Sequence, residues 1–160
     1  MEIEIKRADY TLPQHQTDII FLLNSYALDQ MGGGEPLSPF VQKNLIAELA
    51  ARPYAFSILC YVDGKPAGLA NCLEGFSSFA CKPLINIHDL AVLSEFRSMG
   101  LSQRILKEIE SIAVSKGCCK ITLEVLEGNT TAKGAYRKFG FSGYQLDPKM
   151  GDAVFWTKEL

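Results

Sequence analysis

A short turn between residues 97 and 103 carries the clearest chemistry in this chain. It reads Arg97-Ser98-Met99-Gly100-Leu101-Ser102-Gln103 and joins an apolar run to an amphipathic pattern. The first turn of a helix has unpaired N–H groups and the positive end of the helix dipole, so such a turn binds anions. Gly100 permits a positive φ and a close approach to the backbone. The turn predicts a site for a phosphate-bearing cofactor; a solvated arginine and a plain turn glycine are the alternative.

Three further side chains could take part in chemistry. His88 lies in an apolar run, Asn129 stands before a helical segment, and Tyr136 lies within that segment. A histidine changes charge near neutral pH and can accept a proton, whereas a phenol, with a pKa of about 10, can donate one. Each residue also has a structural interpretation: a strand histidine bonded to a backbone carbonyl, a helix N-cap, and a core aromatic.

The hydrophobic pattern predicts the scaffold that positions these residues. Apolar or alternating runs predict strands over residues 2–7, 55–62, 66–75, 84–92 and 119–125. Caps and period-3.6 patterns predict helices over 17–28, 39–51, 101–116 and 130–138, the first with Ile20, Leu23 and Ala27 on one face. One or two closing strands are expected within residues 143–158. This order predicts one mixed α/β domain over residues 1–160.

Composition narrows the functional classes. The chain has 160 residues, of which 48% are hydrophobic and 21% charged, and its net charge of −2 gives no support for a nucleic-acid partner. No apolar run approaches the ~20 residues of a membrane span. The five cysteines are odd in number and lack a Cys-x-x-Cys spacing, which favours reduced, mostly buried thiols in a cytoplasmic protein and no metal site.

Two motifs resemble those of the GNAT superfamily of acyl-CoA-dependent N-acetyltransferases. The cofactor signature, Arg/Gln-x-x-Gly-x-Gly/Ala, matches residues 97–102, with Ser102 as the last residue, and the lead-in LAVLSEF has Ser94 where proline is common. The block N-x-x-A-x-x-x-Y-x-x-x-G-F matches Asn129, Ala132, Tyr136, Gly140 and Phe141. The resemblance implies the GNAT fold. This fold has a central, mostly antiparallel mixed sheet of six to seven strands, flanked by about four helices and splayed at strands 4 and 5.

The resemblance also implies acetyl-CoA as the cofactor. Backbone N–H groups of the 98–103 turn are expected to hold its pyrophosphate, and the 90–92 strand its pantetheine. A local bulge is expected to splay this strand, so that an N–H such as that of Leu90 faces the thioester oxygen; a fully paired, buried strand is the alternative. The expected cofactor-binding residues are Leu90, Ala91, Val92, Arg97, Ser98, Met99, Gly100, Leu101, Ser102, Gln103, Asn129 and Tyr136.

Catalytic roles follow from the same resemblance. Tyr136 is expected to be the general acid. In polyamine-type members a Glu-Asp-Leu strand supplies the glutamate that deprotonates the acceptor, and His88 stands in its place here, which makes it the expected base. Asp89 is expected on the other face of the strand, because side chains alternate.

The acceptor is expected to bind near the glycine-rich loop at residues 31–36, where Glu35 or Asp29 could hold a cation. A flexible helix connection is the alternative for this loop. The expected substrate-binding residues are Met31, Gly33, Glu35, Phe79 and His88.

The predicted function is transfer of acetyl from acetyl-CoA to a primary amine of a small molecule, by direct attack in a ternary complex. Cys118 and Cys119 stand at a strand start, so an acyl-cysteine intermediate is not expected. The alternatives are a non-catalytic acyl-CoA-binding sensor and a protein or peptide N-acetyltransferase. A homodimer through the segment containing Phe155 and Trp156 is a further expectation.

Overall fold

The computed structural model describes residues 1–160, which form two compact units, Met1–Leu123 and Glu124–Leu160. The first unit holds five strands: β1 (Ile3–Arg7), β2 (Ala55–Val62), β3 (Lys65–Ser77), β4 (Lys82–Val92) and β5 (Ile121–Leu123). Its helices are α1 (Pro13–Leu28), α2 (Pro39–Ala50) and α3 (Leu101–Ser115). The second unit contains α4 (Thr130–Phe139). None of these helices is long and apolar enough to cross a membrane.

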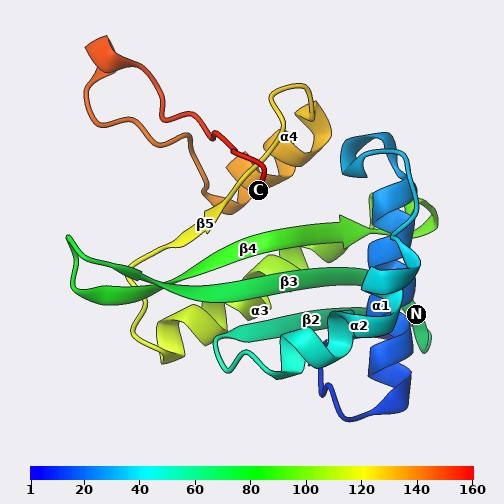
Figure 1. The fold of residues 1–160 in the computed structure, drawn as a ribbon. Helices are drawn as coiled ribbons and strands as arrows, with labels where there is room; N and C mark the ends of the chain where they lie inside the picture. Colours follow the sequence, from blue (N-terminus) through cyan, green and yellow to red (C-terminus); the bar gives the residue numbers. More distant parts are fainter. The chain divides into compact units, whose positions relative to one another are not determined.

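The strands form one sheet in the order β1-β2-β3-β4-β5, of which Figure 1 labels β2 to β5. The first four pair antiparallel with their neighbours, and β5 pairs parallel with β4. This confirms the predicted mixed α/β class, the mostly antiparallel sheet and the four helices. The sheet has five strands, however, and not the six or seven expected.

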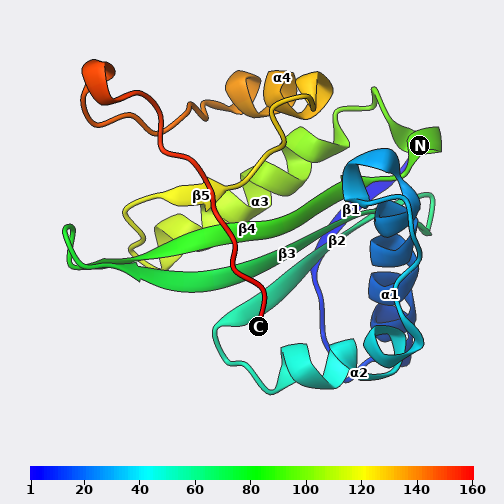
Figure 2. The same cartoon turned by 45° about the horizontal axis from the view of Figure 1, so that its top comes forward.

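Helices cover both faces of the sheet (Figure 2). On one face α3 buries the apolar stripe that its sequence predicts, and its Ile105 side chain approaches the backbone of β3 at Gly68. On the other face α1 packs against β2 and β3, with Leu59, Tyr61 and Leu69 in its core. Burial on both faces explains why β2 reads as a continuous apolar run.

Helix α1 begins at Pro13, four residues before the predicted caps at Thr17 and Asp18. Proline is favoured at a first helical position because its missing N–H needs no partner there. The Thr17 hydroxyl donates to the Pro13 carbonyl at 3.0 Å, as helix-interior threonines do, and Asp18 is buried. The fully buried apolar residues are Ile19 and Leu22. The predicted face of Ile20, Leu23 and Ala27 is partly buried, and of these Leu23 packs against the same core.

The predicted closing strands are absent. Residues 143–160 contain one isolated bridge, between Gln145 and Asp152, and a short 3-10 turn at Pro148–Met150. All residues from 143 onward are exposed, including Phe155 and Trp156 at 71% and 86%. A two-stranded hairpin with no buried face has little to fix its register, which accounts for the error.

Only two of the five cysteines, Cys60 and Cys72, are buried, so the expectation of mostly buried thiols was wrong. Cys81 lies in the β3–β4 turn and Cys119 precedes β5; both are exposed. Their apolar sequence neighbours belong to strands, whereas the cysteines themselves stand just outside the strand interiors.

We expect a maleimide to label Cys81 and Cys119 in the folded protein and to spare Cys60 and Cys72. Burial raises the pKa of Cys60 to about 11 and that of Cys72 to about 12. A raised pKa lowers the thiolate fraction, to about one thiol in a thousand or fewer at pH 7.5, and the thiolate is the reactive form. Mass spectrometry before and after denaturation measures this, and labelling of Cys72 as fast as Cys81 would contradict it.

Candidate active site

Strand β4 contains a β-bulge at His88. On β3, Asn71 pairs with Asp89 and the next residue, Cys72, pairs with Ile87, so His88 has no opposite residue. An extra residue of this kind bends a strand and shifts all later residues by one position. The bulge expected in this strand is therefore present, and it lies at the residue proposed from sequence as a base.

The bulge turns the backbone of Leu90 and Val92 away from β3. After the bulge, Leu93 donates its N–H to the Ala67 carbonyl at the β3 side, at 2.9 Å. Backbone groups of alternate residues point to opposite edges of a strand, so those of Leu90 and Val92 point to the other edge, and those of Ala91 to β3.

Before the bulge, the backbone groups of the odd-numbered residues point to the β5 side, and not to the β3 side as they do after it. Ile85 donates its N–H to the Lys120 carbonyl on the β5 side at 3.2 Å. Without the extra residue at position 88, Leu90 would therefore face β3. The single inserted residue is what presents the Leu90 N–H and carbonyl at the outer edge of β4.

That outer edge is not covered by the fifth strand. The pairing of β4 with β5 spans three residues and ends at Ile87 with Leu123. Residues 88–92 therefore run on beyond the point where the two strands part. This agrees with the splay expected at strands 4 and 5, and it excludes the alternative of a fully paired strand within the sheet.

His88 and Asp89 lie on the same face of the sheet, which overturns the expectation that they alternate. The Asp89 carboxylate accepts from the Asn71 amide at 3.0 Å, and the His88 ring contacts the Asn86 side chain, Nδ1 to Oδ1, at 2.9 Å. Asn86 pairs with Leu73, which shares a face with Asn71 because the two lie two positions apart in the strand. The bulge supplies the physical reason, since it interrupts alternation between positions 88 and 89.

The predicted anion turn has the expected form. Helix α3 begins at Leu101 with Gly100 as its N-cap, and no side chain caps its first turn. Gly100 has a φ of 73°, in the left-handed region that favours glycine, and Ser98 also has a positive φ, of 66°. The first turn of a helix has backbone N–H groups without intrahelical partners, which is the geometry that binds an anion.

An ion pair connects this turn to the glycine-rich loop. The Arg97 guanidinium contacts the Asp29 carboxylate at 3.1 Å, from Nη2 to Oδ2. Asp29 ends α1 and caps the short 3-10 helix at Gln30–Gly32, accepting from the Met31 N–H at 2.9 Å. These two donors, the Met31 N–H first, hold the pKa of Asp29 below its ordinary value.

Backbone hydrogen bonds hold the glycine-rich loop against the end of α1. Gly34 donates its N–H to the Ala27 carbonyl at 2.9 Å, and a Cβ on Gly32 would lie 1.9 Å from the Tyr26 carbonyl oxygen. Gly32 therefore allows the loop to fold back onto the end of α1. Met31 is half-buried there, and Gly33 and Glu35 are exposed.

Phe79 is not brought together with these residues. It is fully exposed at the tip of the β3–β4 hairpin, which projects from the first unit in Figure 1. Phe79 precedes β4, and His88 lies six residues after the start of this strand at Lys82, which places the two roughly 20 Å or more apart at about 3.3 Å per residue.

Asn129 and Tyr136 belong to the second unit. Asn129 caps α4, its Oδ1 accepting from the Ala132 N–H at 3.2 Å, as its structural interpretation predicts. The Tyr136 ring contacts Phe141 edge to face, with centroids 5.9 Å apart. Gly140 ends the helix with a φ of 116°.

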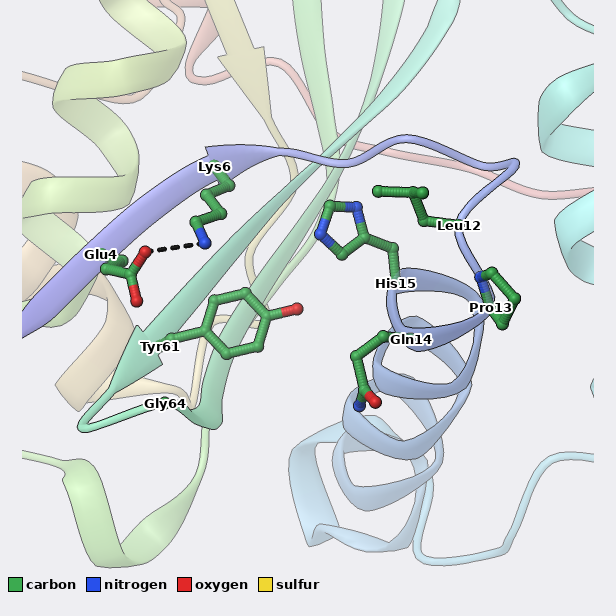
Figure 3. A pocket seen from close by; sticks show the side chains of 8 residues that line it. All are labelled: Glu4, Lys6, Leu12, Pro13, Gln14, His15, Tyr61 and Gly64. Atoms are coloured by element: carbon green, nitrogen blue, oxygen red, sulfur yellow. Dashed lines mark ion pairs between the residues drawn. The ribbon is translucent and has the colours of Figure 1, made fainter.

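A hollow on the first unit lies at the opposite edge of the sheet, between β1, β2 and the start of α1 (Figure 3). Its lining includes Lys6, Gln14, His15 and Tyr61. Lys6 is paired with Glu4 at 2.7 Å, and the Tyr61 hydroxyl donates to the buried Asp18 at 2.7 Å. This hollow shares no residue with the β4 bulge or the 97–103 turn.

Comparison with known proteins identifies the family to which the chain belongs. A model of the acetyltransferase (GNAT) family matches residues 21–141, well over half of the chain. The chain belongs to the GNAT family. A thialysine N-epsilon-acetyltransferase from Bos taurus is 30% identical over 124 residues, which cover 74% of this GNAT chain and 64% of the relative.

Solved structures support the same GNAT fold. The chain superposes on an integron cassette protein from V. cholerae with a TM-score of 0.79 at 21% identity, covering 99% of this chain and 93% of that one. AAC(6')-Iy, in complex with the bisubstrate analogue CoA-S-monomethyl-acetylneamine, gives a TM-score of 0.76 at 17% identity, with both chains fully covered. At these identities the likeness shows the fold alone.

Sequence reasoning missed the residues that hold Asp89. Ser57 and Asn71 are polar residues in otherwise apolar runs of β2 and β3, and both are buried in this GNAT structure. A buried polar residue must find a hydrogen-bond partner, so a lone serine or asparagine within an apolar strand was the available signal.

Proposed function

We propose that this GNAT chain is an acyltransferase that moves the acetyl group of acetyl-CoA to a primary amine of a small molecule. The bulge at His88 is the observation that carries the proposal, because it presents backbone groups beyond the end of the β4–β5 pairing. The uncapped turn at Gly100 follows β4 closely in the chain. An extended ligand with a diphosphate suits such a pair of features.

The proposed cofactor site assigns separate roles to the strand and the turn. Leu90 and Val92 bond the pantetheine, because their backbone groups face the outer edge. The N–H groups of residues 98–103 bind the diphosphate, and Arg97, paired with Asp29, orders the turn. We propose Asn129 and Tyr136 as further cofactor contacts from their place in the family block, within a single domain over residues 1–160.

The proposed reaction is direct attack in a ternary complex. The amine nitrogen attacks the thioester carbon, a C–N bond forms, and the C–S bond breaks as the oxyanion collapses. The Leu90 N–H donates to that oxyanion. Before the attack His88 takes one proton from the acceptor ammonium, and Tyr136 gives its phenolic proton to the leaving thiolate. The nitrogen loses its second proton as the amide forms, and this proton restores the phenol of Tyr136.

Replacing His88 with glutamine should remove this base while keeping a polar side chain beside Asn86. We expect kcat to fall by about 100-fold, with most of the loss near neutral pH, because general bases contribute roughly that much. The acidic limb of the pH–rate profile should flatten. His15→Gln makes the same change at the start of α1, in the hollow at the opposite edge of the sheet, and serves as the matched control. An unchanged acidic limb in the His88 variant would contradict the role.

The test of the proposed function is an amine panel with acetyl-CoA, followed by release of free thiol. Thialysine and lysine come first, because the bovine relative is named for the former. Turnover of free amines supports the proposal. Turnover of peptides alone would favour a protein N-acetyltransferase, and tight CoA binding without any turnover would favour a sensor.

Two further expectations, a cytoplasmic location and a homodimer, belong to the same proposal. Exposed thiols at Cys81 and Cys119 suit a reducing compartment such as the cytoplasm. Light scattering of the purified chain tests the expected homodimer.

A further inference from the structure

A line of hydrogen bonds, buried at its centre, crosses the sheet and ends on Asp89. The Tyr10 hydroxyl contacts Ser57 Oγ at 2.8 Å, Ser57 Oγ donates to Asn71 Oδ1 at 2.6 Å, and Asn71 Nδ2 donates to Asp89 Oδ2 at 3.0 Å. Tyr10 lies between β1 and α1, and the other three side chains come from β2, β3 and β4, which are adjacent in Figure 2. Ser57 and Asn71 are 0% and 6% exposed.

The direction of these bonds is fixed by the carboxylate. Asn71 must turn its NH₂ group toward Asp89, which leaves its carbonyl oxygen to accept from Ser57. The single Ser57 proton is thereby used, so Tyr10 donates to Ser57. Every donor points toward Asp89, and the amide at Asn71 cannot pass a proton along the line. The arrangement holds a charged carboxylate in one orientation and is not a proton relay.

A second carboxylate on the same face shows what a purely structural aspartate looks like here. Asp18 is 3% exposed, and both of its oxygens are bonded, Oδ1 to Gln14 at 2.9 Å and Oδ2 to Tyr61 at 2.7 Å. Asp89 is only partly buried, and its one bond goes to Oδ2. Oδ1 has no donor, and none of the five ion pairs includes Asp89. An aspartate that is fully buried is almost always paired, as Asp18 is, whereas Asp89 keeps one oxygen open to a further donor.

The neighbours of Asp89 favour a cation at this position. Burial first, and then the negative charges of Asp89 and Asp29, raise the pKa of Tyr26 on α1. Asp29 is already paired with Arg97, so Asp89 carries the charge that remains without a cation. The adjacent His88 lies on the same face.

We propose that Asp89 binds the ammonium group of the acceptor through Oδ1, and that Asn71, Ser57 and Tyr10 are positioning residues that orient its carboxylate. The inference rests on the proposed acetyl transfer. The two adjacent residues at the bulge then have separate roles: Asp89 binds the cationic amine, and His88 accepts its proton. It also names the acceptor class: an amine that arrives charged, with Asp89 as its counter-ion.

The first experiment compares Asp89→Asn with Asp18→Asn, using thialysine or the best amine of the panel. Both changes remove a carboxylate charge with little change of shape. We expect Asp89→Asn to raise the acceptor KM about tenfold or more, with the KM for acetyl-CoA within about twofold, because a charge-assisted hydrogen bond is lost. Asp18→Asn should lower the melting temperature and leave the acceptor KM unchanged.

The second experiment tests the hydrogen-bonded line with three variants, Asn71→Leu, Ser57→Ala and Tyr10→Phe, given in order of increasing distance from Asp89 along the line. The acceptor KM should rise most for the first and least for the last. Asn71→Leu combined with Asp89→Asn should be no worse than Asp89→Asn alone, since the line acts through that carboxylate. If Asn71→Leu does not fold, the comparison of Ser57→Ala with Tyr10→Phe tests the same order.

The outcomes separate this inference from the proposed function. Wild-type protein that turns over no amine overturns both. Wild-type turnover with an unchanged acceptor KM in Asp89→Asn overturns the inference alone. A loss confined to kcat would assign Asp89 to the chemical step and would likewise overturn it.

Discussion

Glutamate in place of Ser102 is expected to abolish coenzyme A binding while leaving α3 folded. Position 102 lies in the first turn of α3, where no acidic residue occurs at present and no side chain caps the N–H groups. A carboxylate there faces the proposed diphosphate, and like charges in contact cost several kcal/mol, so affinity should fall about 100-fold or more. The same carboxylate favours the helix by about 0.3–1 kcal/mol through the dipole.

The opposite signs of the two effects make this prediction specific. Calorimetry with coenzyme A measures the affinity, and thermal unfolding measures the stability. Ser111→Glu provides the matched control, because position 111 is exposed in the interior of the same helix and should affect neither quantity strongly. Wild-type affinity in Ser102→Glu would place the diphosphate elsewhere and remove the basis of the proposed cofactor site.

Phenylalanine in place of Tyr136 is expected to lower kcat by about 100-fold or more, with little change in coenzyme A affinity. The change removes one oxygen and keeps the ring that contacts Phe141 edge to face. The thiolate of coenzyme A would then leave without a proton donor. Steady-state release of thiol gives kcat, and calorimetry gives the affinity of the cofactor.

The control for this prediction comes from the same unit. Tyr144 is 64% exposed, so Tyr144→Phe removes the same atom from a side chain with no proposed role and should preserve kcat. A large loss of coenzyme A affinity in Tyr136→Phe, with kcat at saturating acetyl-CoA unchanged, would leave Tyr136 as a cofactor contact alone and not the general acid. An unchanged kcat would exclude it from the reaction.

Local sequence patterns predicted most of the first unit. Strand β2 was placed at its observed bounds and α3 within one residue, because a continuous apolar run and a 3.6-residue period each reflect local burial. The turn at Gly100 was recognisable because a left-handed N-cap favours glycine. Helix α1 was less well predicted, since its sequence does not confine apolar residues to one face and its start lacks a side-chain cap.

The candidate site was predictable only in part, since its features depend on strand register. The bulge at His88 is defined by the pairing of β4 with β3. The residues around His88 do not indicate which of them lacks a partner on that strand. The line that ends at Asp89 joins residues 14 and 18 positions apart in the sequence. The expectation that Asp89 points away from His88 assumed strict alternation, which the bulge breaks.

The bulge has a consequence for how this strand can vary. Its effect depends on counting, because one residue more or fewer between Ile85 and Leu93 would exchange the inward and outward sets of backbone groups on the segment that follows. A substitution in this stretch changes one side chain, whereas an insertion or deletion reverses the edge to which all the following backbone groups of the strand point. Strand length is therefore the more stringent constraint, and engineering of acceptor preference here should vary residue types while keeping the count.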